Sequence, residues 1–154
     1  FQEERIWGAA NAAAGLREAL NLTIQYCRDR KTFGQPLIDN QFIHFKIAEL
    51  SSEVEGLRSL IYRTVDMQMT RNDPFDMEVV RLASMAKFKA GRLSREVMDW
   101  CVQFHGGMGY VTETQINRMF RDCRLVSIGG GADEIMLGVI AKLEGYLPGK
   151  KKNA

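Results

Sequence analysis

The sequence has few of the residues that form disulfides or hold metal ions. Its 154 residues include three cysteines and two histidines. Cys27, Cys101 and Cys123 are odd in number and form no C-x-x-C pair, and His44 and His105 have no ligand partner at metal-site spacing. These absences predict a reducing compartment, free thiols and no metal site.

Neither sign of charge dominates the chain. Charged residues make up 26% of it, yet the formal net charge is +2. Such a balance produces no large positive field, so we expect neither nucleic acid nor an anionic membrane surface as a partner. No apolar run approaches the ~20 residues that span a bilayer, which predicts no stable membrane insertion.

The hydrophobic content, by contrast, is sufficient for one domain. At 154 residues and 45% hydrophobic content, the chain can bury one core but is too short for two domains of usual size. It begins at Phe1 with no basic leader or cleavage-like site, so we expect one part of a longer protein.

Apolar residues recur every three or four positions along most of the chain, which predicts amphipathic helices. Asp73 and Pro74 have the chemistry of a helix start, since Asp can cap free amides and Pro suits the first position. Glycine clusters separate the later segments. The expected helices cover residues 5–28, about 43–65, 73–104, 113–123 and 133–147.

The arrangement of these helices follows from their short connections, which favour antiparallel neighbours. No segment shows sustained alternation of apolar and polar residues between turns, so we expect no strands. The predicted fold is all-α, an up-down four-helix bundle with an extra C-terminal helix over residues 1–148. The basic, polar tail 149–154 is expected to be disordered.

Chemistry must therefore come from the breaks between helices, because a helical bundle names no function. The first break, residues 30–37 followed by Gln41, reads R-x-x-F-G-x-x-L-x-x-x-Q. The second, residues 103–110, reads Q-x-x-G-G-x-G-Y, and residues 118–124 read R-x-x-R-D-x-R. Taken alone, the first is a helix C-cap with favourable positive charge and the second an ordinary Gly-rich connection.

Together, and in this order, the three motifs resemble those of the acyl-CoA dehydrogenases, and the likeness covers nearly the whole chain. The resemblance implies the C-terminal helical domain of a subunit that also has an N-terminal helical domain and a middle β-domain. It implies FAD as the cofactor and a homodimer or homotetramer. The cofactor-binding residues would be Arg30, Thr32, Phe33, Gln41, Gln103, Gly106, Gly107 and Glu134, with Arg30 reaching the pyrophosphate of a neighbouring subunit's FAD.

The position of the catalytic base departs from the commonest family pattern. Most members carry a glutamate in a Y-E-G-T loop before the last helix, where this sequence has residues 129–132, Gly-Gly-Gly-Ala. Long-chain and isovaleryl-type members place the base on the first long helix, before an arginine, and this sequence has Glu4 and Arg5 there. On its own, Glu4 is a first-turn acid that complements the helix dipole.

The resemblance therefore implies a division of labour within an acyl-CoA site. Glu4 would abstract the α-proton of the thioester while the β-hydride leaves for FAD. The amide of Gly130 would donate to the thioester carbonyl, a task that needs no side chain. Arg5 and Gly131 are the expected substrate-binding residues. Fatty acid β-oxidation would be the pathway, and acyl chain length and branching are not defined by the sequence.

Other interpretations remain open at this point. Acyl-CoA oxidases and flavin monooxygenases share the fold but pass electrons to oxygen, whereas a dehydrogenase would pass them to an electron-transfer flavoprotein. A helical oligomerisation module without catalysis is the third alternative. The chain by itself is expected to be inactive, because the missing β-domain would hold the flavin ring. The expected location is the cytoplasm in a bacterium or the mitochondrial matrix in a eukaryote.

Overall fold

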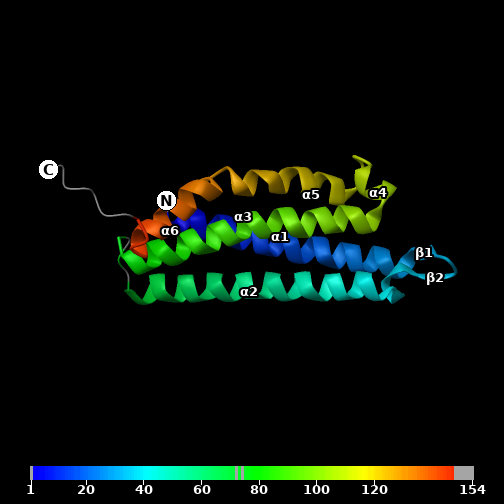
Figure 1. Cartoon of the computed structure of the whole chain (residues 1–154), viewed down its shortest axis with the longest axis horizontal. Helices are drawn as coiled ribbons and strands as arrows, with labels where there is room; N and C mark the ends of the chain where they lie inside the picture. The colour runs from blue at the N-terminus through cyan, green and yellow to red at the C-terminus, as the bar shows by residue number, and fades with distance from the viewer. Residues whose placement is uncertain (1, 72, 74, 148–154) are drawn as a thin grey trace.

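Three long helices run alongside one another and shorter helices cover one side of them (Figure 1). This computed structural model describes residues 2–71, 73 and 75–147. The predicted tail at 149–154 lies outside the described residues. In chain order the elements are α1 (Gln2–Asp29), β1 (Lys31–Thr32), β2 (Gln35–Pro36), η1 (Leu37–Asp39), α2 (Gln41–Arg71), α3 (Met77–His105), α4 (Gly107–Tyr110), α5 (Gln115–Cys123), η2 (Arg124–Ser127) and α6 (Asp133–Leu143).

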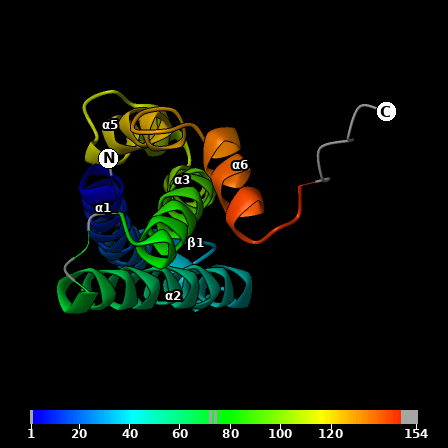
Figure 2. The same ribbon diagram turned by 90° about the vertical axis from the view of Figure 1, so that its left-hand side faces the viewer.

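The helices alternate in direction, as their short connections predicted. Viewed from the end, α3 occupies the centre, with α1 and α2 on two sides, α5 above and α6 on the outer flank (Figure 2). Helix α3 packs against each of these four helices. The predicted all-α bundle with an extra C-terminal helix is confirmed.

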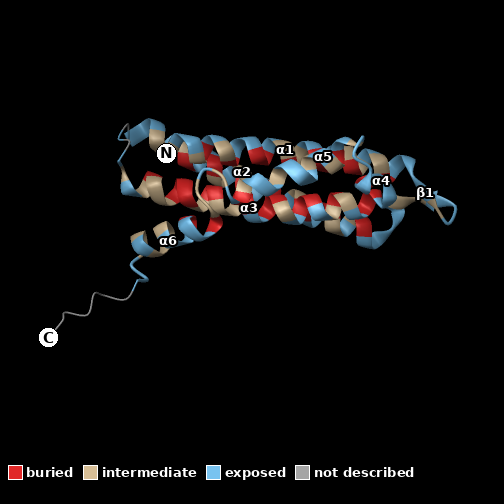
Figure 3. Cartoon of the chain, turned by 90° about the horizontal axis from the view of Figure 1, so that it is seen from above, coloured by how far each residue is buried: buried red, intermediate tan, exposed pale blue. Residues whose placement is uncertain are grey.

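The core lies where the long helices face one another (Figure 3), and it combines small and large side chains. Alanines on α1 and α3 are fully or almost fully buried and allow the two backbones to approach closely. Leucines from α2 and α3 fill the remaining space, and each contributes roughly 1.5–3 kcal/mol by leaving water. The core members include Ala9, Ala13, Ala19, Leu50, Leu57, Leu82, Ala86, Ala90 and Val97.

The start of α3 differs from the prediction. Asp76, not Asp73, caps the helix, because its Oδ1 accepts hydrogen bonds from the backbone N–H groups of Glu78 at 2.9 Å and Val79 at 3.1 Å. Asp73 instead accepts from the N–H of Phe75 at 2.9 Å within the preceding turn. Pro74 lies outside the described residues. Two aspartates with the same capping chemistry stand close together, and the path of the chain selects the second.

The first break contains a short hairpin that the sequence did not predict. Lys31 pairs with Pro36, and Thr32 with Gln35, in an antiparallel register. The turn residues Phe33 and Gly34 have φ angles of 54° and 85°, and such paired positive values are typical of two-residue hairpin loops. Strands of two residues are too short to show alternation, so the expectation of no strands was wrong here.

The last helix ends earlier than predicted, at Leu143 rather than Leu147. Gly145 has a φ of 75° and directs the chain away from the helix axis. The N–H of Tyr146 donates to the carbonyl of Ala141 at 2.9 Å and that of Gly145 to Lys142 at 3.3 Å. This pair of bonds is the Schellman motif that closes many helices at a glycine.

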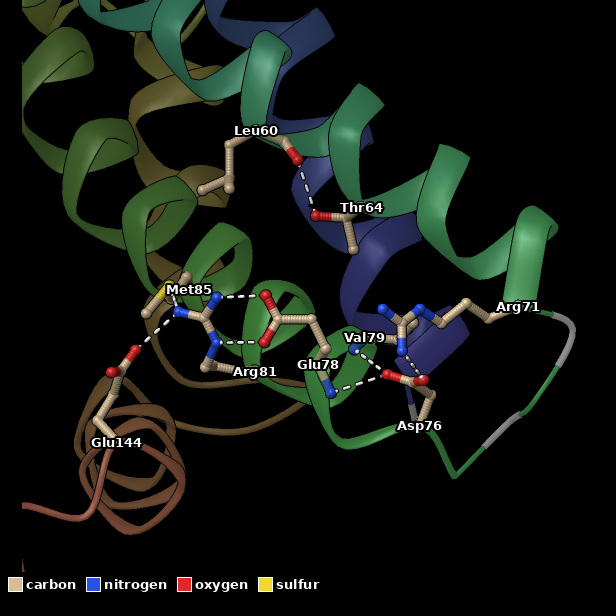
Figure 4. A network of polar contacts seen from close by, with 9 residues as sticks. All are labelled: Leu60, Thr64, Arg71, Asp76, Glu78, Val79, Arg81, Met85 and Glu144. Atoms are coloured by element: carbon tan, nitrogen blue, oxygen red, sulfur yellow. Dashed lines mark hydrogen bonds and ion pairs between the residues drawn. The ribbon is translucent and has the colours of Figure 1, made fainter.

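An arginine joins the beginning of α3 to the end of α6 (Figure 4). Arg81 donates from Nε to Glu78 Oε2 at 2.7 Å and from Nη1 to Glu144 Oε1 at 2.7 Å. A further bond joins Nη2 to Glu78 Oε1. The Arg81 hydrogen bond is the main cause that lowers the pKa of the Glu78 carboxyl. Because Glu144 caps α6, this guanidinium fixes the outer helix against the bundle.

Gly91 on α3 provides the first test of the packing. A methyl group there would lie 2.5 Å from Asp133 Oδ1 and 2.8 Å from Ser127 Oγ, whereas one at Gly56 on α2 would meet nothing within 4 Å. We expect Gly91→Ala to lower the free energy of unfolding by about 1–3 kcal/mol through overpacking. Gly56→Ala should raise it by roughly 0.5–1 kcal/mol through helix propensity. Urea denaturation of both variants measures this, and equal stabilities would contradict the close approach.

The lowered pKa of Glu78 predicts a specific pH dependence. The unfolded chain takes up a proton at Glu78 at higher pH than the folded one, so the stabilisation is present at neutral pH. It should decline as the pH falls below the ordinary value of 4.5 and through the lower folded pKa. Denaturation curves at neutral and acid pH should therefore show a shallower loss of stability in Glu78→Gln than in the unsubstituted chain. Parallel losses would contradict the Arg81 interaction.

Candidate functional site

The residues predicted to act in catalysis and in cofactor binding form two groups at opposite ends of the bundle. Glu4 and Arg5 lie in the first turn of α1, at the end of the bundle where α6 also lies, whereas Arg30 follows the last turn of α1, at the hairpin (Figure 1). At ~1.5 Å per residue, helix α1 separates the two ends by about 40 Å. The two groups therefore cannot contact the same small molecule within one chain.

At the hairpin end, the first two motifs meet in an open pocket of about 560 Å³. Arg30 and Thr32 come from the first break, and Gln103, Gly106 and Gly107 come from the end of α3 and the start of α4. These segments are distant in sequence. They meet because α2 returns the chain and α3 then runs parallel to α1, so that the C-terminal ends of α1 and α3 lie at the same end of the bundle (Figure 1). The remaining lining residues are Tyr26, Leu37, Phe104, His105, Met108 and Val111.

A tyrosine and a histidine join the two sides of this pocket. The rings of Tyr26 and His105 stack with their centroids 4.2 Å apart, and Tyr26 Oη donates to the carbonyl of His105 at 3.2 Å. The His105 Nδ1 lies 2.8 Å from the carbonyl oxygen of Cys101, which can only accept, so Nδ1 carries the proton. Burial lowers the pKa of His105, which keeps the ring neutral at neutral pH.

Two exposed residues of the first break, Arg30 in the pocket and Phe33 in the hairpin turn, have the chemistry that binds an anionic, planar ligand. Phe33 holds a φ of 54°, uncommon for a residue with a side chain, and its ring is fully exposed. The Arg30 guanidinium is also exposed and forms no ion pair with any residue that the structure describes. A guanidinium fork suits phosphate oxygens, and an exposed aromatic ring offers a flat apolar face to a planar ligand.

Three residues of the predicted cofactor group, Phe33, Gln41 and Glu134, do not line this pocket. Gln41 begins α2 and lines a separate shallow hollow with Phe42 and Phe45. Glu134 is an exposed residue in the first turn of α6, at the opposite end of the bundle. One chain thus gathers five of the eight predicted cofactor residues in one pocket: Arg30, Thr32, Gln103, Gly106 and Gly107.

At the other end, the first turns of α1 approach the loop between η2 and α6. The start of α1 and this loop both lie near the same residue of α3, Lys87, whose side chain is buried, with 4% of the residue exposed. A methyl group on Gly8 would lie 3.9 Å from Lys87 Cε, and one on Gly130 would lie 3.6 Å from it. Glu4 is exposed on the first turn of α1, where a ligand can reach its carboxylate. The structure thus brings the predicted base helix and the predicted carbonyl-binding loop to one side of the bundle.

The charges around this end come from residues that the sequence analysis missed. Burial lowers the pKa of Lys87 and nearby Arg5 lowers it further, while Asp133 opposes both. Asp133, 4% exposed, accepts from Arg95 Nη2 at 3.1 Å. Lys87 stands at helical spacing from the buried Ala83 and Ala90, so a lysine on an apolar stripe was the signal that could have identified it.

Neither a metal site nor a membrane span emerges from the described part of the chain. Among residues 2–71, 73 and 75–147, no group of three or more His, Cys, Asp or Glu side chains could hold a metal ion. Within the same ranges, no helix is both long enough and apolar enough to cross a bilayer.

Comparison with known proteins identifies the relatives of this arrangement. Residues 1–144 match the family model for the acyl-CoA dehydrogenase C-terminal domain. The CarC subunit of the caffeyl-CoA reductase–Etf complex from Acetobacterium woodii is 34% identical over 87% of this chain and 34% of its own length. The mitochondrial short-chain specific acyl-CoA dehydrogenase of Sus scrofa is 35% identical over 87% of this chain and 32% of its own length.

Solved structures agree with these sequence relatives. The structure of butyryl-CoA dehydrogenase from Megasphaera elsdenii superposes with a TM-score of 0.83 at 32% identity, over 92% of this chain and 36% of that one. The chain spans about a third of the length of the curated relatives it matches. The chain therefore belongs to the acyl-CoA dehydrogenase family and has the fold of that family's C-terminal domain.

Proposed function

We propose that this chain is the C-terminal part of an FAD-dependent enzyme that introduces a double bond between the α and β carbons of an acyl-CoA thioester. The observation that carries the proposal is the pocket at the hairpin end. It unites Arg30 and Thr32 with Gln103, Gly106 and Gly107, which come from two motifs far apart in the sequence. A helical assembly module has no need of a pocket that gathers residues of two motifs beside an exposed guanidinium.

The pocket residues would hold FAD by its polar part. The fork of Arg30 suits a pyrophosphate because its donors match phosphate oxygens, and Phe33 offers a flat apolar face. Gln41 and Glu134 would complete the contacts from other copies of the chain. When bound, FAD accepts the hydride from the β carbon of the substrate. Because the pocket lies about 40 Å from Glu4 along α1, each subunit would hold the cofactor of its neighbour, in a homodimer or homotetramer.

The other end would supply the groups that act on the thioester. Glu4 would take the α-proton, because a carboxylate beside the substrate is a suitable general base. The backbone N–H of Gly130 would donate to the thioester oxygen and stabilise the negative charge that develops there. Arg5 and Gly131 would line the same substrate. This placement corresponds to the long-chain and isovaleryl-type arrangement, in which the loop carries glycine and α1 carries the base.

Electrons would leave the enzyme through an electron-transfer flavoprotein. One relative, the CarC subunit from Acetobacterium woodii, belongs by name to a reductase–Etf complex.

The name of this relative also favours a second candidate function, reduction of an enoyl-CoA, in which Glu4 would return a proton to the α carbon. Oxidation of the anaerobically reduced enzyme by a panel of enoyl-CoAs, compared with its reduction by acyl-CoAs, distinguishes the two directions. The protein would reside in the cytoplasm of a bacterium or in the mitochondrial matrix.

Replacing Arg30 tests the cofactor pocket. In the full-length protein, Arg30→Leu should weaken FAD binding by roughly 10- to 100-fold, because it removes a charge-assisted contact of about 1.5–3 kcal/mol. Arg28→Leu is the matched control, since Arg28 is an exposed arginine of the same helix that does not line the pocket. Titration of apoprotein with FAD measures both affinities. Equal affinities in the two variants would exclude Arg30 from cofactor binding.

Replacing Glu4 tests the chemistry. Anaerobic bleaching of the flavin by a panel of acyl-CoAs should slow by roughly 100- to 10,000-fold or more in Glu4→Gln, because the general base is lost while FAD stays bound. Glu3→Gln, at the adjacent exposed position, should bleach like the unsubstituted enzyme. Unchanged bleaching in Glu4→Gln would move the base elsewhere, and no bleaching by any acyl-CoA in the unsubstituted enzyme would contradict the proposed function.

A further inference from the structure

Lys87 is a buried lysine whose hydrogen bonds are directed at one loop. Its side chain emerges from α3 and is 4% exposed. Its Nζ donates to the backbone carbonyl of Val126 and lies 3.4 Å from the carbonyl oxygen of Gly131. Burying an ammonium group is costly, and here backbone carbonyls rather than a carboxylate receive it.

These two carbonyls stand on either side of Gly130 in the sequence, in a segment that contains three successive glycines. Gly130 and Gly131 have φ angles of 68° and 112°, which glycine adopts readily but other residues rarely do. The N–H groups of Ile128 and Gly129 bond to the carbonyl of Leu125, which fixes the beginning of the loop. Lys87 contacts the segment on both sides of Gly130, at the carbonyls of Val126 and Gly131.

The charged residues around Lys87 do not provide it with an ion pair. Asp133 is the nearby carboxylate, and its Oδ2 already accepts from Arg95 at 3.1 Å and faces Arg92 at 3.7 Å. Among the described residues Lys87 forms no ion pair with it. Arg5, on the other side, has the same charge as Lys87 and adds to the effect of burial in lowering the lysine's pKa. The ammonium is thus held by the carbonyls of the loop.

Lys87 also lies near the helix that carries Glu4. A methyl group on Gly8 would lie 3.9 Å from Lys87 Cε, and one on Gly130 would lie 3.6 Å from the same atom. The side chain therefore lies between α1 and the glycine loop. Its length and its two hydrogen bonds set how far the loop stands from the first turns of α1.

We propose that Lys87 is a positioning residue for the reaction, which aligns the Gly130 amide with the thioester carbonyl by holding the loop from Val126 to Gly131 against α1. This inference rests on the proposed function, in which that amide stabilises the charge developing on the thioester oxygen. Lys87 itself touches neither substrate nor cofactor. Its loss would leave the general base and the flavin in place but misalign the donor.

The test compares Lys87→Met with Lys89→Met in the full-length, FAD-loaded enzyme. Methionine keeps much of the length of lysine but cannot donate to the carbonyls. Lys89 lies on the same helix and pairs with Glu53 at 2.7 Å in a partly exposed position, a contact expected to contribute little. Three quantities are measured: bound FAD per subunit, the limiting rate of anaerobic bleaching by an acyl-CoA, and the infrared stretch of a ¹³C-labelled thioester carbonyl on the bound substrate.

We expect Lys87→Met to retain FAD and to bleach roughly 10- to 100-fold more slowly, below the ~100- to 1,000-fold that loss of a carbonyl-stabilising donor itself costs. The carbonyl stretch should move to higher frequency, because a misaligned amide polarises the bond less. Lys89→Met should change neither quantity. Reduced FAD content with an unchanged rate per bound flavin and an unchanged stretch would show a structural role alone and overturn the proposal.

A second variant keeps the test decisive if Lys87→Met does not fold. Lys87→Gln retains an amide that can donate to one carbonyl, and it should show a smaller shift of the stretch in the same direction. A stretch identical to that of the unsubstituted enzyme would overturn the role of Lys87. If the unsubstituted enzyme bleaches normally, that result leaves the proposed function intact, whereas failure of the unsubstituted enzyme to bleach contradicts the proposed function instead.

Discussion

The close contact between α1 and α3 is the constraint on which the rest of the structure depends. Buried alanines on both helices, such as Ala9, Ala13, Ala86 and Ala90, let the backbones approach closely. In a core packed this densely, one additional methylene group disturbs the packing. The same closeness recurs where α3 meets the start of α6, because Gly91 leaves no room for a methyl group beside Asp133 and Ser127. Helix α3 is thereby fixed against its neighbours on all sides.

This fixed central helix sets the geometry of both functional ends. Lys87 lies in its first half, beside the glycine loop, and Gln103 lies at its far end, in the pocket with Arg30. Because a packed helix neither stretches nor bends easily, the distance between the two ends is a property of the fold and not of the loops. The proposed sharing of FAD between subunits follows from this length, since one chain presents the proposed base, Glu4, and the proposed pyrophosphate-binding residue, Arg30, about 40 Å apart.

The loops at the two ends contain proposed site residues, and side chains from the helices hold these loops in place. Tyr26 and His105 tie the first helix to the turn before α4, while Arg81 ties α6 to α3 through Glu144. Lys87 does the same for the glycine loop. Three glycines in succession cannot hold their own conformation, because they lack side chains that pack. A buried donor from a rigid helix is a physical solution to that problem.

The sequence by itself determined the helices, because a 3.6-residue period is a local property that each segment carries without its neighbours. Its three motifs also indicated the family before any geometry was known. The sequence could not decide between local signals of equal strength. Asp76 rather than Asp73 caps α3, the two-residue strands were not predicted, and α6 ends at Leu143 rather than Leu147. The separation of Glu134 from the Arg30 pocket, the contact of Gly8 and Gly130 with Lys87, and the role of that lysine were decided by the tertiary structure alone. Such relations join residues distant in the chain, and only the packing of one helix against another creates them.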